Sequence, residues 1–168
     1  PLFRIQALKI LKIYGAFING IMKLYFTHKR GCFYDEDKLQ EIIKPKSRYV
    51  FAGVVNGLLL VHDEKFGLME VRGHKIYDVV GGHVLAGKMV TTILPLSENK
   101  FLIGTINDGF YIWDMQKIYP WGVSVNPLFK DINIFCGIQY NKDLFAIGTI
   151  QGGLLVIDKQ GDVVMHID

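Results

Sequence analysis

Short apolar runs separated by turn residues occupy most of the chain. The clearest are Phe101–Thr105 with Gly109–Asp114, and Leu144–Thr149 with Gly153–Asp158. In both pairs a Thr stands four residues before a Gly, and that Gly opens a second apolar run that ends at Asp. Apolar runs this short, bounded by Gly, Asn and Asp, predict β-strands joined by tight turns.

Two further copies of this pattern are more degraded. One covers Leu24–Asp35, and the other covers Leu58–Val71, where Asp63 stands in place of the Thr. The glycines that anchor the four copies are Gly31, Gly67, Gly109 and Gly153. Their separations are 67−31=36, 109−67=42 and 153−109=44 residues. A repeat of about 40–50 residues is typical of the blades of a β-propeller.

Another apolar run precedes each copy, and a short run follows it. The preceding runs are Tyr14–Ile18, Tyr49–Val55, Met89–Leu96 and Ile134–Tyr140. The first two end at Asn19-Gly20 and Asn56-Gly57, and Asn-Gly indicates a hairpin because a type I′ turn needs positive φ at both central positions. Each unit therefore has four antiparallel strands, which is the plan of a propeller blade.

We therefore predict an all-β chain, residues 1–168, that forms a single β-propeller segment of about four four-stranded antiparallel blades. The predicted blades span 13–43, 49–80, 89–121 and 132–168, and residues 1–12 are a candidate strand of a preceding blade. A blade is apolar on both faces and needs neighbours to cover it, whereas soluble proteins seldom expose large apolar patches. Three arrangements meet this need: a larger propeller, pairing with another copy, or closure at four blades. The start at Pro1 rather than Met favours the first.

Composition narrows the class of protein. Half of the residues are hydrophobic and 21% are charged, which is typical of an ordered domain. The net charge of +3 is spread along the chain and forms no basic stripe for nucleic acid. Cys32 and Cys136 lie in apolar runs, and we expect both to be packed. The run Ile13–Met22 is too short to span a membrane.

The sequence contains no pattern typical of an enzyme or a metal site. It has no Gly-x-Ser-x-Gly elbow, phosphate-binding loop or dinucleotide fingerprint. Its five histidines do not have metal-ligand spacing. We expect no catalytic residue, cofactor or metal. Thr105 and Thr149 are expected to satisfy backbone groups, and Asp114 and Asp158 to cap turns.

The repeat also resembles a known family. Ile103-Gly104-Thr105 to Asp114, and Ile147-Gly148-Thr149 to Asp158, are similar to the two-component-regulator propeller repeat. The resemblance covers about Tyr49 to the C-terminus, and Thr27 lacks the preceding Gly. It implies a seven-bladed, non-catalytic sensor propeller on the periplasmic or extracellular side of a bacterial membrane receptor. The relatives are hybrid sensor kinases and one-component regulators of Bacteroidetes, whose ligands are commonly carbohydrate fragments.

The turns and connections that share one face of a propeller contain the candidate ligand-binding residues. A sugar site needs planar polar groups and an aromatic platform. The candidates are Arg30, Asn107, Asp108, Trp121 and Gln151, and the alternative is that they are solvated turn residues. The leading hypothesis is a sensor that binds a small molecule or oligosaccharide. A protein-interaction propeller and a propeller-type lyase or hydrolase are the alternatives.

Overall fold

The computed structural model describes the backbone of residues 14–18, 22–27, 30–35, 38–73 and 75–168, and the side chains from Ile43 onward except at 74. These residues form four four-stranded antiparallel sheets, and the strands of each sheet lie in chain order. We call the sheets blades 1 to 4. The predicted strand within residues 1–12 lies outside the described residues.

The four blades have the following strands. Blade 1 contains β1 (Tyr14–Ile18), β2 (Met22–Thr27), β3 (Arg30–Asp35) and β4 (Lys38–Ile43). Blade 2 contains β5 (Tyr49–Val55), β6 (Leu58–Asp63), β7 (Gly67–Arg72) and β8 (Lys75–Asp78). Blade 3 contains β9 (Val90–Ser97), β10 (Lys100–Thr105), β11 (Gly109–Trp113) and β12 (Ile118–Pro120). Blade 4 contains β13 (Ile134–Gln139), β14 (Leu144–Thr149), β15 (Leu154–Asp158) and β16 (Val163–Ile167).

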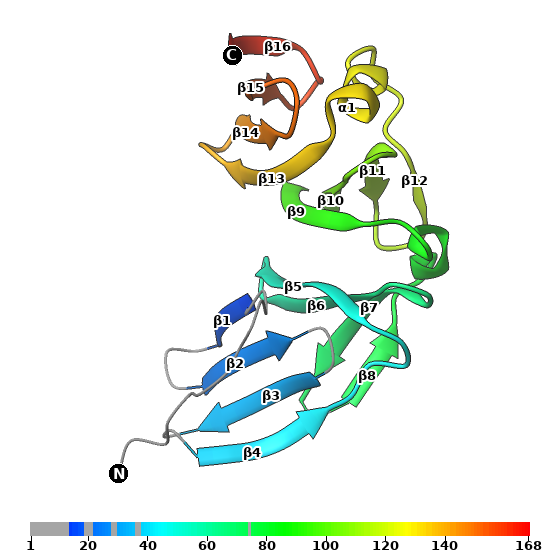
Figure 1. Cartoon of the computed structure of the whole chain (residues 1–168), viewed down its shortest axis with the longest axis vertical. Coiled ribbons are helices and arrows are strands. Elements are labelled where there is room, and N and C mark those ends of the chain that lie inside the picture. The colour runs from blue at the N-terminus through cyan, green and yellow to red at the C-terminus, as the bar shows by residue number, and fades with distance from the viewer. Residues whose placement is uncertain (1–13, 19–21, 28–29, 36–37, 74) are drawn as a thin grey trace.

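The blades follow one another along an open arc. The first strands β1, β5, β9 and β13 contact one another in that order and lie toward the inside of the arc, while β4 and β16 lie at its two ends (Figure 1). This arrangement confirms the prediction of a β-propeller sector.

Two short helices lie in the connections between blades, where the sequence pattern predicts none. The 3₁₀-helix η1 spans Gly82–Leu85, and α1 spans Asn126–Ile132. Pro127 is at the start of α1, where its missing N–H costs no hydrogen bond and its fixed φ suits the first turn. Within the described residues, no helix is long and apolar enough to cross a membrane.

The hydrophobic core lies between neighbouring blades. Between blades 2 and 3, Leu60 and Leu68 pack in one cluster with Phe101 and Trp113, whose rings stack with centroids 4.9 Å apart. A second cluster joins blade 3 to blade 4, and a third includes Ile43 of blade 1 with residues of blade 2. The blades therefore bury their faces against one another, as their two-sided apolar pattern requires.

The repeated Thr residues have the predicted backbone role. The Thr105 hydroxyl donates to the Gly109 carbonyl at 2.7 Å and accepts from the Asp108 N–H at 3.2 Å. Thr149 makes the same two bonds, to the Gly153 carbonyl at 2.8 Å and from the N–H of residue 152 at 2.9 Å. Each hydroxyl thus closes the turn between the second and third strands of its blade.

The repeated Asp residues cap the next turn, as predicted. Asp114 Oδ1 accepts from the N–H groups of Gln116 at 3.1 Å and Lys117 at 2.9 Å. Asp158 Oδ1 accepts from the N–H groups of residues 160 and 162, both at 2.9 Å. The backbone N–H bonds lower the pKa of Asp114, the bond from Lys117 most of all.

Cys136 differs from the prediction that it is packed. Its side chain is exposed on β13, because it belongs to the face of blade 4 that none of the described elements covers. The side chain of Cys32 lies outside the described residues.

Candidate functional site

Turns and connections from successive blades meet on one face of the arc. We call it the connection face and define it by the turns 64–66, 106–108 and 150–153 with the connections 44–48, 79–89 and 121–133. The N–H groups of Glu64 and Ile106 donate to the carbonyls of Arg48 and Met89 at 2.8 and 2.9 Å. The Ile150 N–H donates to the carbonyl of residue 132 at 3.2 Å. Each turn is thereby fixed to the connection that enters its own blade.

The same turn residue also reaches the next blade. The Glu64 carbonyl accepts from the Gly87 N–H at 2.6 Å, and the Ile106 carbonyl accepts from the Ile134 N–H at 3.2 Å. Gly87 and Ile134 lie on the chain that enters blades 3 and 4. The residue that follows the Thr position is therefore a backbone joint between consecutive blades.

Asp63 takes the Thr position in blade 2, and its carboxylate binds both the turn and the connection that enters the blade. Its buried carboxylate accepts from the N–H of Ser47 at 2.8 Å, from the Ser47 hydroxyl, and from the Lys65 N–H at 3.1 Å. Burial acts to raise the pKa of Asp63, but the hydrogen bonds from Ser47 and Lys65 outweigh it and hold that pKa below its ordinary value. A charged acceptor here fixes the connection 44–48 onto the turn.

Two ion pairs repeat on this face, one in each of blades 2 and 3. The Arg48 guanidinium lies 2.7 Å from Glu64 Oε1, and Lys88 Nζ lies 2.9 Å from Asp108 Oδ1. Lys88 also lies over the Tyr111 ring, 5.6 Å from its centroid. The hydrogen bond to Asp108 raises the pKa of Lys88, so this amine stays charged throughout the physiological range.

Asn126 anchors the connection that contains α1. Its buried Oδ1 accepts from the Phe110 N–H at 2.6 Å, and its Nδ2 donates to the carbonyls of Phe110 at 3.1 Å and Trp121 at 2.8 Å. A Cβ at Gly109 would lie 2.5 Å from Asn126 Oδ1, and the φ of Gly109 is +73°. Glycine is therefore required at the start of β11 on both counts.

The structure places three of the predicted residues on this face, two of them exposed. Asn107 is exposed and its Oδ1 accepts from Asn133 Nδ2 at 2.9 Å. Asp108 is half-buried beside Lys88. Gln151 is exposed, and its N–H donates to the carbonyl of residue 132 at 3.1 Å.

Trp121 does not have the role predicted for it. Its ring packs edge-on against Phe110 with centroids 5.9 Å apart, and only 8% of the residue is exposed. It belongs to the core between blades 3 and 4 and offers no platform to a ligand. Arg30 is the first residue of β3 and pairs with Thr27 through the backbone register. The side chain of Arg30 lies outside the described residues.

Sequence reasoning missed Lys88 and Asn133, which stand beside the predicted Asp108 and Asn107. The sequence does contain a pattern that indicates Lys88. In blades 2 and 3, a basic residue precedes the first strand and an acidic residue follows the second strand. In blade 2 these residues are Arg48 and Glu64. Since both positions border the same turn, this pattern predicts an ion pair in each blade.

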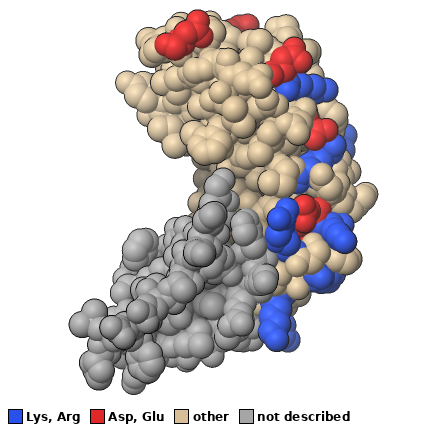
Figure 2. Space-filling model, viewed as in Figure 1, with Lys and Arg blue, Asp and Glu red and all other residues tan. Residues whose placement is uncertain are grey.

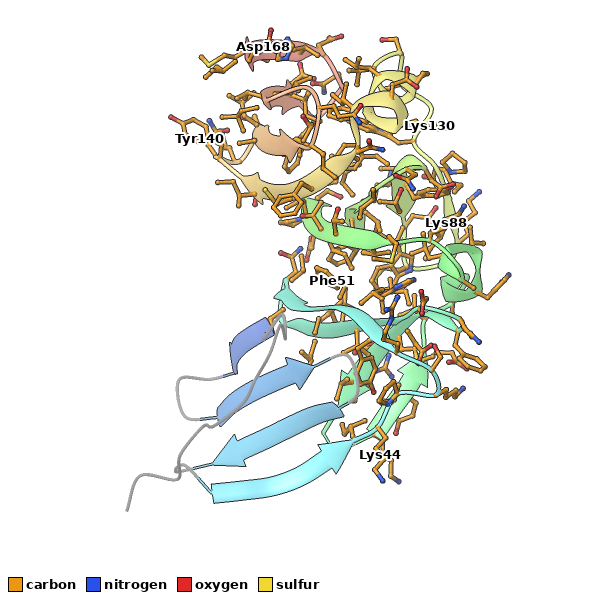
Figure 3. The ribbon with its side chains drawn as sticks, viewed as in Figure 1. Lys44, Phe51, Lys88, Lys130, Tyr140 and Asp168 are labelled. Carbon is orange, nitrogen blue, oxygen red and sulfur yellow. The ribbon has the colours of Figure 1, made fainter. Side chains whose placement is uncertain are left out.

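The connection face is positively charged. Its segments carry six Lys and Arg and three Asp and Glu, a balance of 6−3=+3. Figure 2 shows basic side chains in a band along the right-hand edge of the described surface. Lys44, Lys88 and Lys130, from three successive connections, lie along this edge, and Tyr140 lies on the opposite side (Figure 3).

The connection face also presents apolar side chains to solvent. The exposed ones are Phe66 at 46%, Val80 at 63%, Met89 at 38%, Leu128 at 42% and Ile150 at 57%. A surface that combines positive charge, exposed amides and apolar side chains is suited to recognition of a ligand or a partner. In the described part of the chain, no three His, Cys, Asp or Glu side chains are grouped as metal ligands.

Comparison with known proteins supports the fold. No family model matches the chain, and no curated protein matches it in sequence. Among solved structures it is similar to the extracellular domain of the putative hybrid two-component system BT3049 from B. thetaiotaomicron. The TM-score is 0.72 and the identity 16%, over 92% of this chain and 22% of that chain. The chain thus spans less than a quarter of that domain.

The chain is also similar to two further solved structures. The WD40 β-propeller domain of Doa1 has a TM-score of 0.64 and 13% identity, over 90% of this chain and 53% of that chain. YCF48 bound to D1 peptide has a TM-score of 0.64 and 9% identity, over 84% of this chain and 48% of that chain. At these identities the likeness shows the fold alone.

Proposed function

We propose that this chain is a non-catalytic recognition sector of a sensor propeller on the extracellular side of a bacterial signalling receptor. Its ligand binds on the connection face and is an oligosaccharide fragment. The observation that carries the proposal is the convergence of turns from several blades on one positively charged face with exposed Asn107 and Gln151. The structural similarity to the extracellular domain of a hybrid two-component system supports it.

The chemistry of the face supports recognition rather than turnover. The carboxylates of Glu64 and Asp108 are paired with cations, and the Thr105 hydroxyl serves the backbone. The Nδ2 of Asn107 and the amide of Gln151 are the groups left for planar hydrogen bonds to sugar hydroxyls. The surplus of cations favours an acidic oligosaccharide over a neutral one.

A second candidate function is recognition of a peptide or protein. The exposed Phe66, Val80 and Ile150 favour it, because apolar contacts dominate the centres of protein interfaces. One structural relative is bound to a peptide. An acidic, partly apolar peptide suits the same face.

Thermal unfolding in the presence of neutral and acidic oligosaccharides tests the first candidate. A ligand at 100 times its dissociation constant stabilises the folded state by about 2.7 kcal/mol. We expect acidic oligosaccharides to raise the unfolding temperature, and Gln151→Ala with Asn107→Ala to remove most of the shift. Asn99→Ala is the matched control, since this exposed Asn lies in the turn between β9 and β10, at the other end of blade 3 from the connection face.

Two outcomes would count against the oligosaccharide proposal. One is stabilisation by an acidic peptide library and by no oligosaccharide, which selects the second candidate. The other is a shift that Asn99→Ala reduces as much as Gln151→Ala, which moves the binding site to the opposite face.

A further inference from the structure

Blade 4 has one apolar face that the described chain leaves open. Ile138, Ala146, Val156 and Met165 pair across its four strands and therefore point to one side of the sheet. Ile138 is 62% exposed and Met165 53%. The neighbouring pair of Leu154 and Ile167 is also exposed, at 38% and 51%. We call these six residues the free face of blade 4.

The matching face of blade 3 is fully covered. Leu94, Leu102 and Ile112 occupy the positions of Ile138, Ala146 and Val156 in the repeat. They are 5%, 0% and 4% exposed, in the cluster that joins blade 3 to blade 4. Blade 2 repeats the arrangement, with Leu60 at 0% exposure packed against blade 3. The free face is thus the third copy of a surface that twice packs against a following blade.

The backbone joint gives an independent indication. In blades 2 and 3 the carbonyl after the Thr position accepts an N–H from the chain that enters the next blade, at 2.6 and 3.2 Å. In blade 4 that position is Ile150, which is 57% exposed. Its N–H already makes the bond to its own blade. A following blade would supply the donor for its carbonyl.

The contact of β13 with β9 indicates what the following blade must present. The Gly137 carbonyl accepts from the Thr92 hydroxyl at 3.1 Å, and a Cβ at Gly137 would lie 3.2 Å from both Thr92 and Leu94. A small residue in the middle of the first strand therefore allows close approach. On the same side of blade 4, Cys136 and Ile138 hold the positions of Thr92 and Leu94.

We propose that the free face of blade 4 is a docking surface for one further four-stranded blade that follows it in the same ring. The first strand of that blade lies on β13 as β13 lies on β9, with a small residue over Ile138. The N–H at the start of that strand donates to the Ile150 carbonyl. This inference concerns ring assembly and is independent of the proposed ligand.

The test extends the full chain by a second copy of residues 121–168, placed after Asp168. That copy carries the required features, Gly137 and the Ile134 N–H. With Cys32→Ser and with Ser at the second copy's position 136, the original Cys136 is the sole thiol. We expect its alkylation by N-ethylmaleimide to be at least about tenfold slower in the extended chain than in the 168-residue chain, because a covered thiol reacts slowly.

Ile138→Asp separates docking from general stabilisation. Its side chain is exposed in the 168-residue chain, so we expect little effect there and loss of thiol protection in the extended chain. Val80→Asp, at 63% exposure on the connection face, is the matched control and should leave both rates unchanged.

A second version guards against poor fit of the added blade. Ala146→Leu with Leu154→Phe gives the original blade 4 the side chains of blade 3 at positions 102 and 110. The proposal is overturned if neither extended chain protects Cys136. It is also overturned if the 168-residue chain shows protection that grows with concentration and that Ile138→Asp removes, since a second copy then covers the face.

Discussion

Blades 3 and 4 have the same sequence pattern and very different surroundings. Phe110 of blade 3 is 0% exposed, whereas Leu154 at the same repeat position in blade 4 is 38% exposed. Thr105 is fully buried, and Thr149 makes the same two hydrogen bonds at a site open to solvent. The comparison shows that the neighbouring blade, rather than the pattern of the blade itself, decides how much each residue contributes to stability.

The largest expected difference between the two blades concerns their apolar side chains. We expect Phe110→Ala to lower the free energy of unfolding of the 168-residue chain by about 3–5 kcal/mol, because it leaves a cavity in the core. Leu154→Ala should cost less than about 1 kcal/mol, since much of that side chain is already in water. Urea denaturation followed by circular dichroism measures both. Equal costs would show that the face of blade 4 is covered in solution.

The two Thr residues should differ by a smaller amount. Thr105→Val removes a hydroxyl from a buried turn and leaves the Gly109 carbonyl without it, which we expect to cost about 1–3 kcal/mol. Thr149→Val breaks the same bonds where water can replace them, so the cost should stay below about 1 kcal/mol. The same denaturation experiment compares them. A larger loss at Thr149 than at Thr105 would contradict this view of the turn.

A third contrast is confined to acid pH. Blade 2 has His62 where blades 3 and 4 have Gly104 and Gly148. Burial lowers the pKa of His62, and its Nε2 lies 2.9 Å from the Leu85 carbonyl. Because the unfolded chain takes up a proton near pH 6.5 and the folded chain resists it, stability should fall as pH drops below about 6.5.

The loss associated with His62 should be at most about 1.4 kcal/mol for each pH unit. His62→Gln keeps an amide donor for the Leu85 carbonyl and does not titrate, so we expect a flatter profile between pH 7.5 and 5. Denaturation midpoints across this range measure the effect. An unchanged slope in the variant would assign the pH dependence to other groups.

Much of the fold could be predicted from the repeated Gly, Thr and Asp residues of the sequence. The glycines at 67, 109 and 153 all have positive φ, and the Thr and Asp residues of blades 3 and 4 make the local bonds that their spacing predicts. Such features depend on a few neighbouring residues in the chain, and they can therefore be predicted from the sequence pattern.

The candidate site was harder to predict because its contacts join distant segments. Lys88 forms an ion pair with Asp108, 20 residues away in the chain. The Asn126 side chain accepts a hydrogen bond from the N–H of Phe110, 16 residues away. Trp121 was predicted to be an exposed loop residue, but its ring packs against Phe110 in the core. Cys136 is exposed for the opposite reason, since an apolar strand is buried only where a neighbour lies against it. These outcomes depend on packing between blades, which the repeat alone does not encode.

The amide of Asn126 has a consequence for how this surface can vary. The Asn126 side chain and the Trp121 N–H together meet the hydrogen-bonding needs of Phe110, so the outer strand of blade 3 can stop after three residues. Beyond Asn126, Phe129 stays in the core at 0% exposure, while the residues on either side of it are exposed. Substitutions of Leu128 and Lys130, which are exposed, can therefore give new binding specificities while the scaffold stays intact.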